Sequence, residues 1–577
     1  MGKRISLAAA AALVLTGLGC ASYLPEREMP DSVVPAAGQN WTDEQRSWFH
    51  HTSQGTKLMP YAWFLALEQP FLSWPSAAPP FASPAYMARF GFLPSPRSAI
   101  NPDGLPVGFA RDEFGVQEGS EEPEVVVGLT CAACHTGQIE YGRRAVRIEG
   151  GPSMADVGAF QDQIGVALFL TYGSEPRFAR FAQSVLARNG QPNTEETRAA
   201  LHRRLGLALD RGRTEAGLAD RRRLYPVTEG FGRLDALGRG ANFVFATLPN
   251  MPNNLAVADA PVSYPGLWDA PWFDWVQYNG AIRQPMGRNV AEAMGVRAIV
   301  KPTGGPAEPI HRSSVRVQNI YDMETMLAGP APGLGLRAPA WPEDLLGPID
   351  RAAAERGRVQ FAQLCAGCHQ PWDPAAQGAG IPRITMVPLD RIGTDPRAAM
   401  NFVNRTATLP NGRRVSAAQG LQEATTDVIN AFYDANNVPE RGSWVDAAGN
   451  VRPGRLEMNG NRPNEWRAPA AYRARPLNGI WATAPYLHNG AVPNLYQMLL
   501  PAERRDAVFH VGSRQFDPRN VGFVAAESRG TFRFDTSLPG NSNRGHEFRN
   551  GPLGNGTIGP ELSDQQRRDI VEYLKTL

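Results

Sequence analysis

The chain has 577 residues and a mass of 62.8 kDa, more than one ordinary hydrophobic core accommodates, so we expect two or more domains. Its 58 Lys and Arg residues against 56 Asp and Glu residues leave a net charge of only +2. This balance gives no reason to expect a polyanionic partner, and we exclude nucleic acid on that ground.

Residues 1–20, MGKRISLAAAAALVLTGLGC, have the order of a secretory signal: a basic start, an apolar run and a small-residue end. The run is too short to span a membrane. Cys20 stands where a lipoprotein cysteine would, although Gly17 replaces the usual leucine of that signal. Two outcomes remain open. Either a lipid at Cys20 anchors the chain through a Pro-containing spacer at residues 21–40, or the signal is cleaved and the protein is periplasmic or secreted.

Two Cys-x-x-Cys-His motifs dominate the chemistry of a chain that has only five cysteines and nine histidines. The motif is the attachment signature of c-type haem, in which both thiols bind the porphyrin and the histidine ligates the iron. A zinc site would need the two pairs roughly 15–20 residues apart, and here they are much farther apart. A thioredoxin-like site would need a βαβ setting, which neither flank supplies. A disulfide within each pair is possible after export, but it gives no reason for the histidines. We predict two covalent c-type haems at these residues: Cys131, Cys134 and His135; Cys365, Cys368 and His369.

The segments around the first motif alternate in character. The approach EEPEVVVGLT is β-branched and follows a proline, which predicts an extended segment. Helical patterns follow in SMADVGAFQDQIGVALFLTY and in the charged TEETRAALHRRLGLALDRGRTEAGLADRRRLY. The aromatic-rich stretch PVSYPGLWDAPWFDWVQYNGAIRQPMGRNVAEAMGV reads as irregular. We assign residues 41–340 to an N-terminal haem domain.

The second motif is entered by a different kind of segment. DRAAAERGRVQFAQLCAGCH predicts a helix from near Asp350, and the C-terminal LSDQQRRDIVEYLKTL opens with Ser563 and Gln566 in capping-box spacing. One helix entering the motif and another crossing it is the arrangement of a small cytochrome c domain, which we place at residues 341–577. With 50 prolines and 58 glycines, the expected fold is mainly α: two cytochrome c-like haem domains with long ordered loops and little β.

The two motifs, together with RARPLNGIWATAPYLHNGAVPNLYQMLL at residues 473–500, resemble the bacterial di-haem cytochrome c peroxidase superfamily. The specific part is TAPYLHNG at residues 483–490. GTKLMPYAWFLALEQP, CAACHTGQIEY, PMGRNVAEAMGV and GNSNRGH are similar to the di-haem rubber oxygenases and their relatives. The resemblance implies a largely helical protein whose N-terminal haem reacts with peroxide or O2, while its C-terminal haem stores or relays electrons.

The expected axial ligands distinguish the two haems, because an iron with protein ligands on both sides transfers electrons and an open one binds O2 or peroxide. The resemblance implies His546, on a Gly/Asn-rich loop before the final helix, as sixth ligand of the second haem. Met498 and Met458 remain rivals, because other di-haem peroxidases use methionine there. His488, inside the 483–490 motif, is expected to support the haem pocket by hydrogen bonding or to have a surface or structural role.

The N-terminal histidines His50, His51 and His202 read as solvent-facing, so we expect the first haem to be open. The resemblance also implies a tryptophan between the haems. Among Trp268, Trp272 and Trp275 we favour Trp268, in PGLWD, with a packed interdomain aromatic as the alternative. No clear counterpart of the distal phenylalanine of rubber oxygenases follows it, which argues against rubber cleavage.

We therefore expect an exported di-haem oxidoreductase that activates hydrogen peroxide or O2 at the His135 haem, with the His369 haem as electron partner. A peroxidase would take electrons from a small cytochrome or copper protein. An oxygenase would act on an apolar organic substrate, and would be favoured by a pocket without acid/base groups. The alternatives are a non-catalytic electron-transfer cytochrome and an enzyme that oxidises a protein partner.

Overall fold

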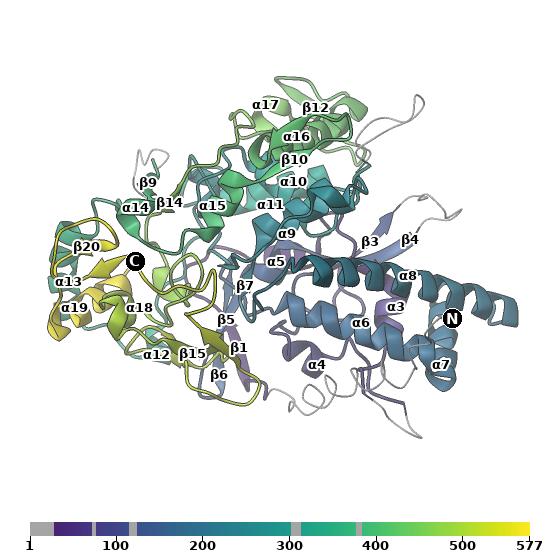
Figure 1. The fold of residues 1–577 in the computed structure, drawn as a ribbon, viewed down its shortest axis with the longest axis horizontal. Coiled ribbons are helices and arrows are strands. Elements are labelled where there is room, and N and C mark those ends of the chain that lie inside the picture. The colour runs from purple at the N-terminus through teal and green to yellow at the C-terminus, as the bar shows by residue number, and fades with distance from the viewer. Residues whose placement is uncertain (1–27, 72–76, 115–123, 302–312, 375, 377–382) are drawn as a thin grey trace.

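The computed structural model describes residues 28–71, 77–114, 124–301, 313–374, 376 and 383–577 (Figure 1). Helices make up 38% of the structure and strands 16%, distributed over many small sheets. The fold is therefore mixed α/β, and the expectation of a mainly α protein with little β is wrong. Most strands have only two to four residues, too few for the period-two alternation that identifies a strand in a sequence.

The α-helices vary from one turn to eight. They are α2 (Asp43–His51), α3 (Tyr61–Ala66), α4 (Pro84–Ala88), α5 (Cys131–Cys134), α6 (Val157–Gly173), α7 (Glu175–Arg188), α8 (Glu195–Arg222), α9 (Ala236–Asn242), α10 (Pro285–Gly295), α11 (Val317–Ala328), α12 (Glu343–Leu346), α13 (Arg351–Leu364), α14 (Leu389–Ile392), α15 (Arg397–Asn404), α16 (Ala417–Ala435), α17 (Arg455–Met458), α18 (Leu495–Met498) and α19 (Asp564–Leu574).

Two sheets have three strands. In one, β6 (Arg144–Glu149) lies between β1 (Ser32–Pro35), which is parallel to it, and β5 (Thr136–Tyr141), which is antiparallel; in the other, β4 (Glu124–Leu129) lies between β2 (Met59–Pro60) and β3 (Phe109–Phe114), both antiparallel. The remaining strands form pairs: β7 (Arg233–Leu234) with β8 (Val262–Ser263), β9 (Thr385–Pro388) with β14 (Ala471–Ala474), β10 (Thr406–Thr408) with β11 (Arg414–Ser416), β12 (Ser443–Val445) with β13 (Val451–Pro453), β15 (Val508–Val511) with β18 (Phe532–Asp535), β16 (Phe516–Asp517) with β17 (Gly522–Phe523), and β19 (Glu547–Phe548) with β20 (Thr557–Gly559).

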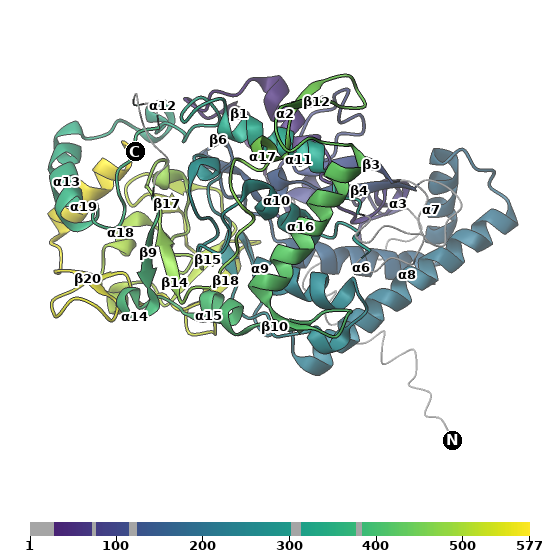
Figure 2. The same ribbon diagram turned by 90° about the horizontal axis from the view of Figure 1, so that it is seen from above.

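Several expected elements are confirmed. The approach to the first motif is strand β4, and the two helical patterns after it form α6 and α8. Helix α13 begins directly after Asp350, whose carboxylate accepts from two backbone N–H groups, and α19 has the expected capping box of Ser563 and Gln566. Both views place α13 and α19 side by side at one end of the molecule, with α6, α7 and α8 at the other (Figures 1 and 2).

The aromatic-rich stretch contains an unexpected helix, α10. Pro285 occupies its first turn, where the missing N–H costs nothing, and the Gln284 side chain accepts from the Gly287 N–H at 3.2 Å. Apart from strand β8 and a 3-10 helix at Ala270–Trp272, the rest of the stretch is irregular, as expected. Helix α10 packs against α16, so the core around it combines residues from before and after position 340. The domain boundary at that position stays a prediction.

The largest core joins the N-terminal segment to the C-terminal helices. Trp41 and Phe49 share it with Trp268, Trp481 and α19. A second core, rich in phenylalanine, fills the space among α3, α6 and α7. In the described part of the chain, no helix combines the length and apolar character needed to cross a membrane.

Candidate functional site

The first Cys-x-x-Cys-His motif sits between two sheets. Strand β4 delivers the chain to Thr130, α5 holds both cysteines in a single helical turn, and β5 begins directly after His135. The turn packs tightly on Gly108, which has a φ of +87°, and a Cβ there would lie 2.2 Å from the backbone of Ala133. Only glycine allows this approach, which fixes the motif against β3.

Each proximal histidine is oriented by one backbone carbonyl. Nδ1 of His135 donates to the Pro265 carbonyl at 2.9 Å, and Nδ1 of His369 donates to the Arg475 carbonyl at 2.8 Å. Because a carbonyl only accepts, the proton of each neutral ring is on Nδ1 and the Nε2 lone pair is left for a metal. Burial lowers the pKa of His135 to about 4 and also lowers that of His369, so both rings are neutral near pH 7.

The motif thiols are separate from one another. Within the described residues none of the four is in a disulfide. Burial raises the pKa of Cys131, Cys134 and Cys365 to about 12. Cys20 lies outside the described residues, and so does the lipid anchor expected there.

His546 lies opposite His369. The centroids of the two rings are 6.1 Å apart. Two imidazoles that ligate one metal from opposite sides, each through a bond of about 2 Å, have their centroids about 6 Å apart. Nδ1 of His546 is buried and has no partner among the described residues, and burial lowers the pKa of His546 to about 3. A neutral imidazole with this spacing fits an iron held between two histidines.

The loop that presents His546 is held by Arg505. His546 has a φ of 49°, an unusual backbone conformation for a residue other than glycine. It follows Gly545, which has a φ of +77°. The buried Arg505 guanidinium donates to the carbonyls of Asn543 at 2.5 Å, Gly545 at 3.0 Å and His546 at 2.8 Å. Asn489, from the 483–490 motif, donates to two further carbonyls at the start of the loop.

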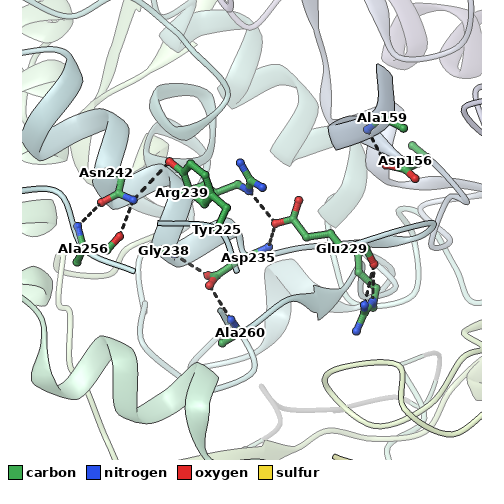
Figure 3. Close-up of polar contacts among 12 residues, drawn as sticks. Asp156, Ala159, Tyr225, Glu229, Asp235, Gly238, Arg239, Asn242, Ala256 and Ala260 are labelled. Atoms are coloured by element: carbon green, nitrogen blue, oxygen red, sulfur yellow. Dashed lines mark hydrogen bonds and ion pairs between the residues drawn. The ribbon is translucent and has the colours of Figure 1, made fainter. Parts of the chain in front are cut away.

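A buried polar network ties the same loop to the N-terminal half. Glu229 accepts from the Asp235 backbone N–H at 2.9 Å and from Nε of Arg239 at 2.7 Å (Figure 3). Its own carbonyl accepts from Arg233, which donates onward to the Asn541 side chain at 2.8 Å. The position of the loop therefore depends on residues from both halves of the chain.

The other expected ligands and supports lie elsewhere in the fold. Met458 belongs to the core beside α10, whereas Met498 is in the core that Cys365 contacts. His488 is buried and stacks on Tyr472 with 4.1 Å between ring centroids, and its carbonyl accepts from Ser263. We find it in a packing role.

Trp268 joins the two backbone segments that orient the motif histidines. It is fully buried, and its indole N–H donates to the Asn478 carbonyl at 2.7 Å. Trp268 is three residues from Pro265, the partner of His135, and Asn478 is three residues from Arg475, the partner of His369. The guanidinium of Arg475 lies 5.9 Å from the Trp268 ring and donates to Gly266 at 3.0 Å.

The two rival tryptophans are placed differently. Trp272 donates to the Ala328 carbonyl at 3.1 Å, and Trp275 stacks under Arg467 at 3.7 Å. Neither contact involves a residue that hydrogen-bonds a proximal histidine.

The expectation that His50 and His51 face solvent is wrong, because both are buried. Nε2 of His50 lies 2.8 Å from Glu149, and His51 contacts the Phe109 carbonyl at 2.9 Å and the Ser95 hydroxyl at 2.8 Å. Their partners are distant in the sequence, which is why helix α2 gave no sign of burial. The exposed reading of His202 is also incomplete, because its half-buried ring stacks on Tyr172.

Sequence reasoning missed a polar group beside the first motif. Arg288 and Glu292 are four residues apart on α10 and therefore share a helix face. Arg288 pairs with the buried Glu324, and Gln277 donates to Glu292 at 2.9 Å. Burial is the main cause of the raised pKa of Cys131, and the charge of Glu292 adds to it. Burial raises the pKa of Glu292 as well. The i, i+4 spacing was the available signal.

The comparisons with known proteins found one family match and two curated relatives. Residues 471–510 match the family described as RoxA-like, cytochrome c-like. The uncharacterized protein y4iJ of Sinorhizobium fredii (strain NBRC 101917 / NGR234) is 40% identical over 98% of this chain and 97% of its own length. The uncharacterized protein y4iM of the same strain is 29% identical over 57% of this chain and 66% of its own length. The family match includes the 483–490 motif and Arg505, and it shows that this segment is cytochrome c-like.

Proposed function

Because the chain belongs to the same family as y4iJ and is cytochrome c-like in residues 471–510, we propose that it is an exported di-haem c-type cytochrome oxidoreductase. It reduces hydrogen peroxide at an N-terminal haem with electrons relayed through a C-terminal haem, as in the di-haem cytochrome c peroxidase superfamily. The observation that carries the proposal is the Trp268–Asn478 hydrogen bond, which joins the segment whose Pro265 carbonyl accepts from His135 to the segment whose Arg475 carbonyl accepts from His369.

Two sets of residues would hold the haems. Cys131, Cys134 and His135 would hold the first, and Cys365, Cys368 and His369 would hold the second, with His546 available as a further ligand. When bound, the haems supply the one-electron chemistry and the iron at which peroxide reacts. The protein supplies neutral imidazoles, whose Nδ1 hydrogen bonds fix the ring orientation and raise the basicity of the ligand.

The two sites differ in their open faces. His546 lies opposite His369. In the described part of the chain, the aromatic ring that contacts His135 is that of Tyr264, with 6.2 Å between ring centroids. The Tyr264 hydroxyl is engaged with the Arg233 carbonyl at 3.3 Å. His50 and His51 are held by protein partners. These contacts support an open first iron, which is what a reaction centre needs.

Glu292 and Arg288 favour peroxide over an apolar substrate. Reduction of one peroxide to two water molecules consumes two electrons and two protons. A half-buried carboxyl with a raised pKa beside the first motif can hold and deliver a proton, and a buried guanidinium stabilises developing negative charge. An oxygenase acting on an apolar substrate is the second candidate, because the match at residues 471–510 is RoxA-like.

The test is rapid mixing of the fully reduced protein with one equivalent of peroxide. We expect both haems to be oxidised, and Glu292→Gln to slow the reaction by about 10²-fold or more while haem content is unchanged. A small periplasmic cytochrome or copper protein should then reduce the oxidised haems again. A reduced wild-type protein that is inert to peroxide but consumes O2 would favour the oxygenase, and inertness to both would leave a non-catalytic electron-transfer cytochrome.

A further inference from the structure

Three arginine side chains gather between the two Cys-x-x-Cys-His motifs. Arg288, on α10, acts electrostatically on His135, and Arg475 provides the carbonyl that orients His369. Arg473 lies two residues before Arg475, at the end of β14, and acts electrostatically on both of the others. Like charges in such proximity raise the free energy of the site unless anions compensate them.

Two of the three have protein partners. Arg288 is paired with Glu324, and Arg475 donates to the Gly266 carbonyl at 3.0 Å. Arg473 differs. Its Nε and Nη1 atoms are buried and have no hydrogen-bond partner among the described residues. The contact of its guanidinium is with the face of Phe273, 5.6 Å from the ring centroid.

The positive charge around Arg473 favours binding of an anion. Arg475 lies over the same Phe273 ring at 5.8 Å, so two guanidinium groups share one aromatic neighbour. Asp274 acts electrostatically on Arg473, but its carboxylate accepts from the Ile384 backbone N–H at 3.1 Å. An unpaired buried guanidinium is costly, because each lost hydrogen bond to water has to be replaced.

A haem carries two carboxylates on its propionate side chains, and a guanidinium is the side chain whose planar donors match a carboxylate. We propose that Arg473 binds a propionate of one of the two haems and raises the reduction potential of that haem. The inference rests on the proposed function only in requiring that haem is bound. The raised potential follows because a nearby cation favours the reduced iron, which carries one positive charge less than the oxidised iron.

The experiment is a spectroelectrochemical titration of the purified haem-loaded protein, wild type against Arg473→Gln. We expect the reduction equilibrium of one haem to shift toward the oxidised form by about tenfold, which is 59 mV for a one-electron couple. The matched control is Arg467→Gln, because Arg467 stacks on Trp275 and donates to Gly280 rather than facing the cluster. A shift of the low-spin haem assigns the propionate to the C-terminal haem, and a shift of the other assigns it to the N-terminal haem.

The outcome that overturns the proposal is two unchanged potentials in Arg473→Gln protein that retains both haems. Should that variant fail to accumulate, Arg473→Lys decides. It keeps the charge but loses the planar contact, so the propionate bending band in resonance Raman should move, and an unmoved band contradicts the assignment. A wild-type protein without haem would sink the proposed function instead, so the two failures are distinguishable.

Discussion

His135 and His369 are prepared for a metal by the same backbone contact. In each ring Nδ1 donates to a carbonyl more than a hundred residues away in the chain, and burial keeps the ring neutral. Metal-binding histidines in proteins generally have such a partner. The two histidines could be predicted as metal ligands from five-residue motifs. The carbonyls of Pro265 and Arg475 could not be predicted, because no sequence pattern around these residues identifies them as partners of a histidine.

His51 should make stability depend on pH. Burial lowers its pKa to about 4 from the usual 6.5, so below pH 6.5 the unfolded chain binds a proton that the folded chain does not. Stability is therefore full above pH 6.5 and falls progressively as the pH drops to 4, by about 3 kcal/mol at most from this group. His51→Gln should remove that component. Denaturant unfolding at pH 7.5 and 4.5 measures the loss in the free energy of unfolding between the two pH values. An equal loss in the wild type and in His51→Gln would contradict the assignment.

His546→Ala should convert the C-terminal haem from low spin to high spin or to another ligand. The ring spacing of 6.1 Å to His369 is the reason, and the first haem should be unaffected because, among the described residues, the ring contacts of His546 are with His369 and Phe548 and not with the first motif. Optical and EPR spectra measure the change. His488→Gln is the matched control, since His488 is also buried but stacks on Tyr472. An unaltered low-spin signal in His546→Ala would transfer the expectation to Met498.

At the level of elements, long periodic or capped segments were predictable and short ones were not. The N-caps and the spacing of apolar residues predict helices α13 and α19. The paired strands of two to four residues arise from contacts between distant loops, such as β9 with β14. Helix α10 was hidden because its proline and glycines suggested a loop, although Pro285 occupies the one turn that tolerates it.

The loop of His546 should depend on one buried guanidinium. Arg505→Ala removes three carbonyl contacts from the loop, so the His546 backbone loses the support for its positive φ. We expect a mixture of low-spin and high-spin signals at the C-terminal haem, with haem content unchanged. EPR at low temperature measures the ratio. Arg544→Ala is the control, because Arg544 is an exposed residue of the same loop, and equal spectra for both variants would refute the role of Arg505.

At the level of the whole molecule, Trp268 joins the segment that orients His135 to the segment that orients His369. Trp268→Phe keeps an aromatic ring but removes the hydrogen bond to Asn478, so electron exchange between the haems should slow while haem content is unchanged. The milder change is preferable because truncating a buried Trp to Ala costs about 3–5 kcal/mol. Trp272→Phe is the matched control, since its indole also donates to a carbonyl. Rapid-mixing kinetics measure the exchange, and equal rates in the two variants would exclude Trp268 from the path.

The Trp268 connection was only partly predictable. The resemblance implied a tryptophan at the interface and the sequence offered three, but only the structure relates Pro265 and Asn478 to the proximal histidines. The boundary at position 340 shows the same limit, because helix packing across it, as between α10 and α16, leaves no local trace in either half.

Carbon monoxide binding, measured together with the number of haems per chain, decides between the proposed enzyme and an electron-transfer cytochrome. We expect two haems in the fully reduced protein and one CO bound per chain. Cys131→Ala combined with Cys134→Ala should leave one haem and abolish CO binding, because the lost haem is the open one and His546 occupies the other. A reduced wild-type protein that holds fewer than two haems, or whose irons both resist CO, would contradict the proposed function.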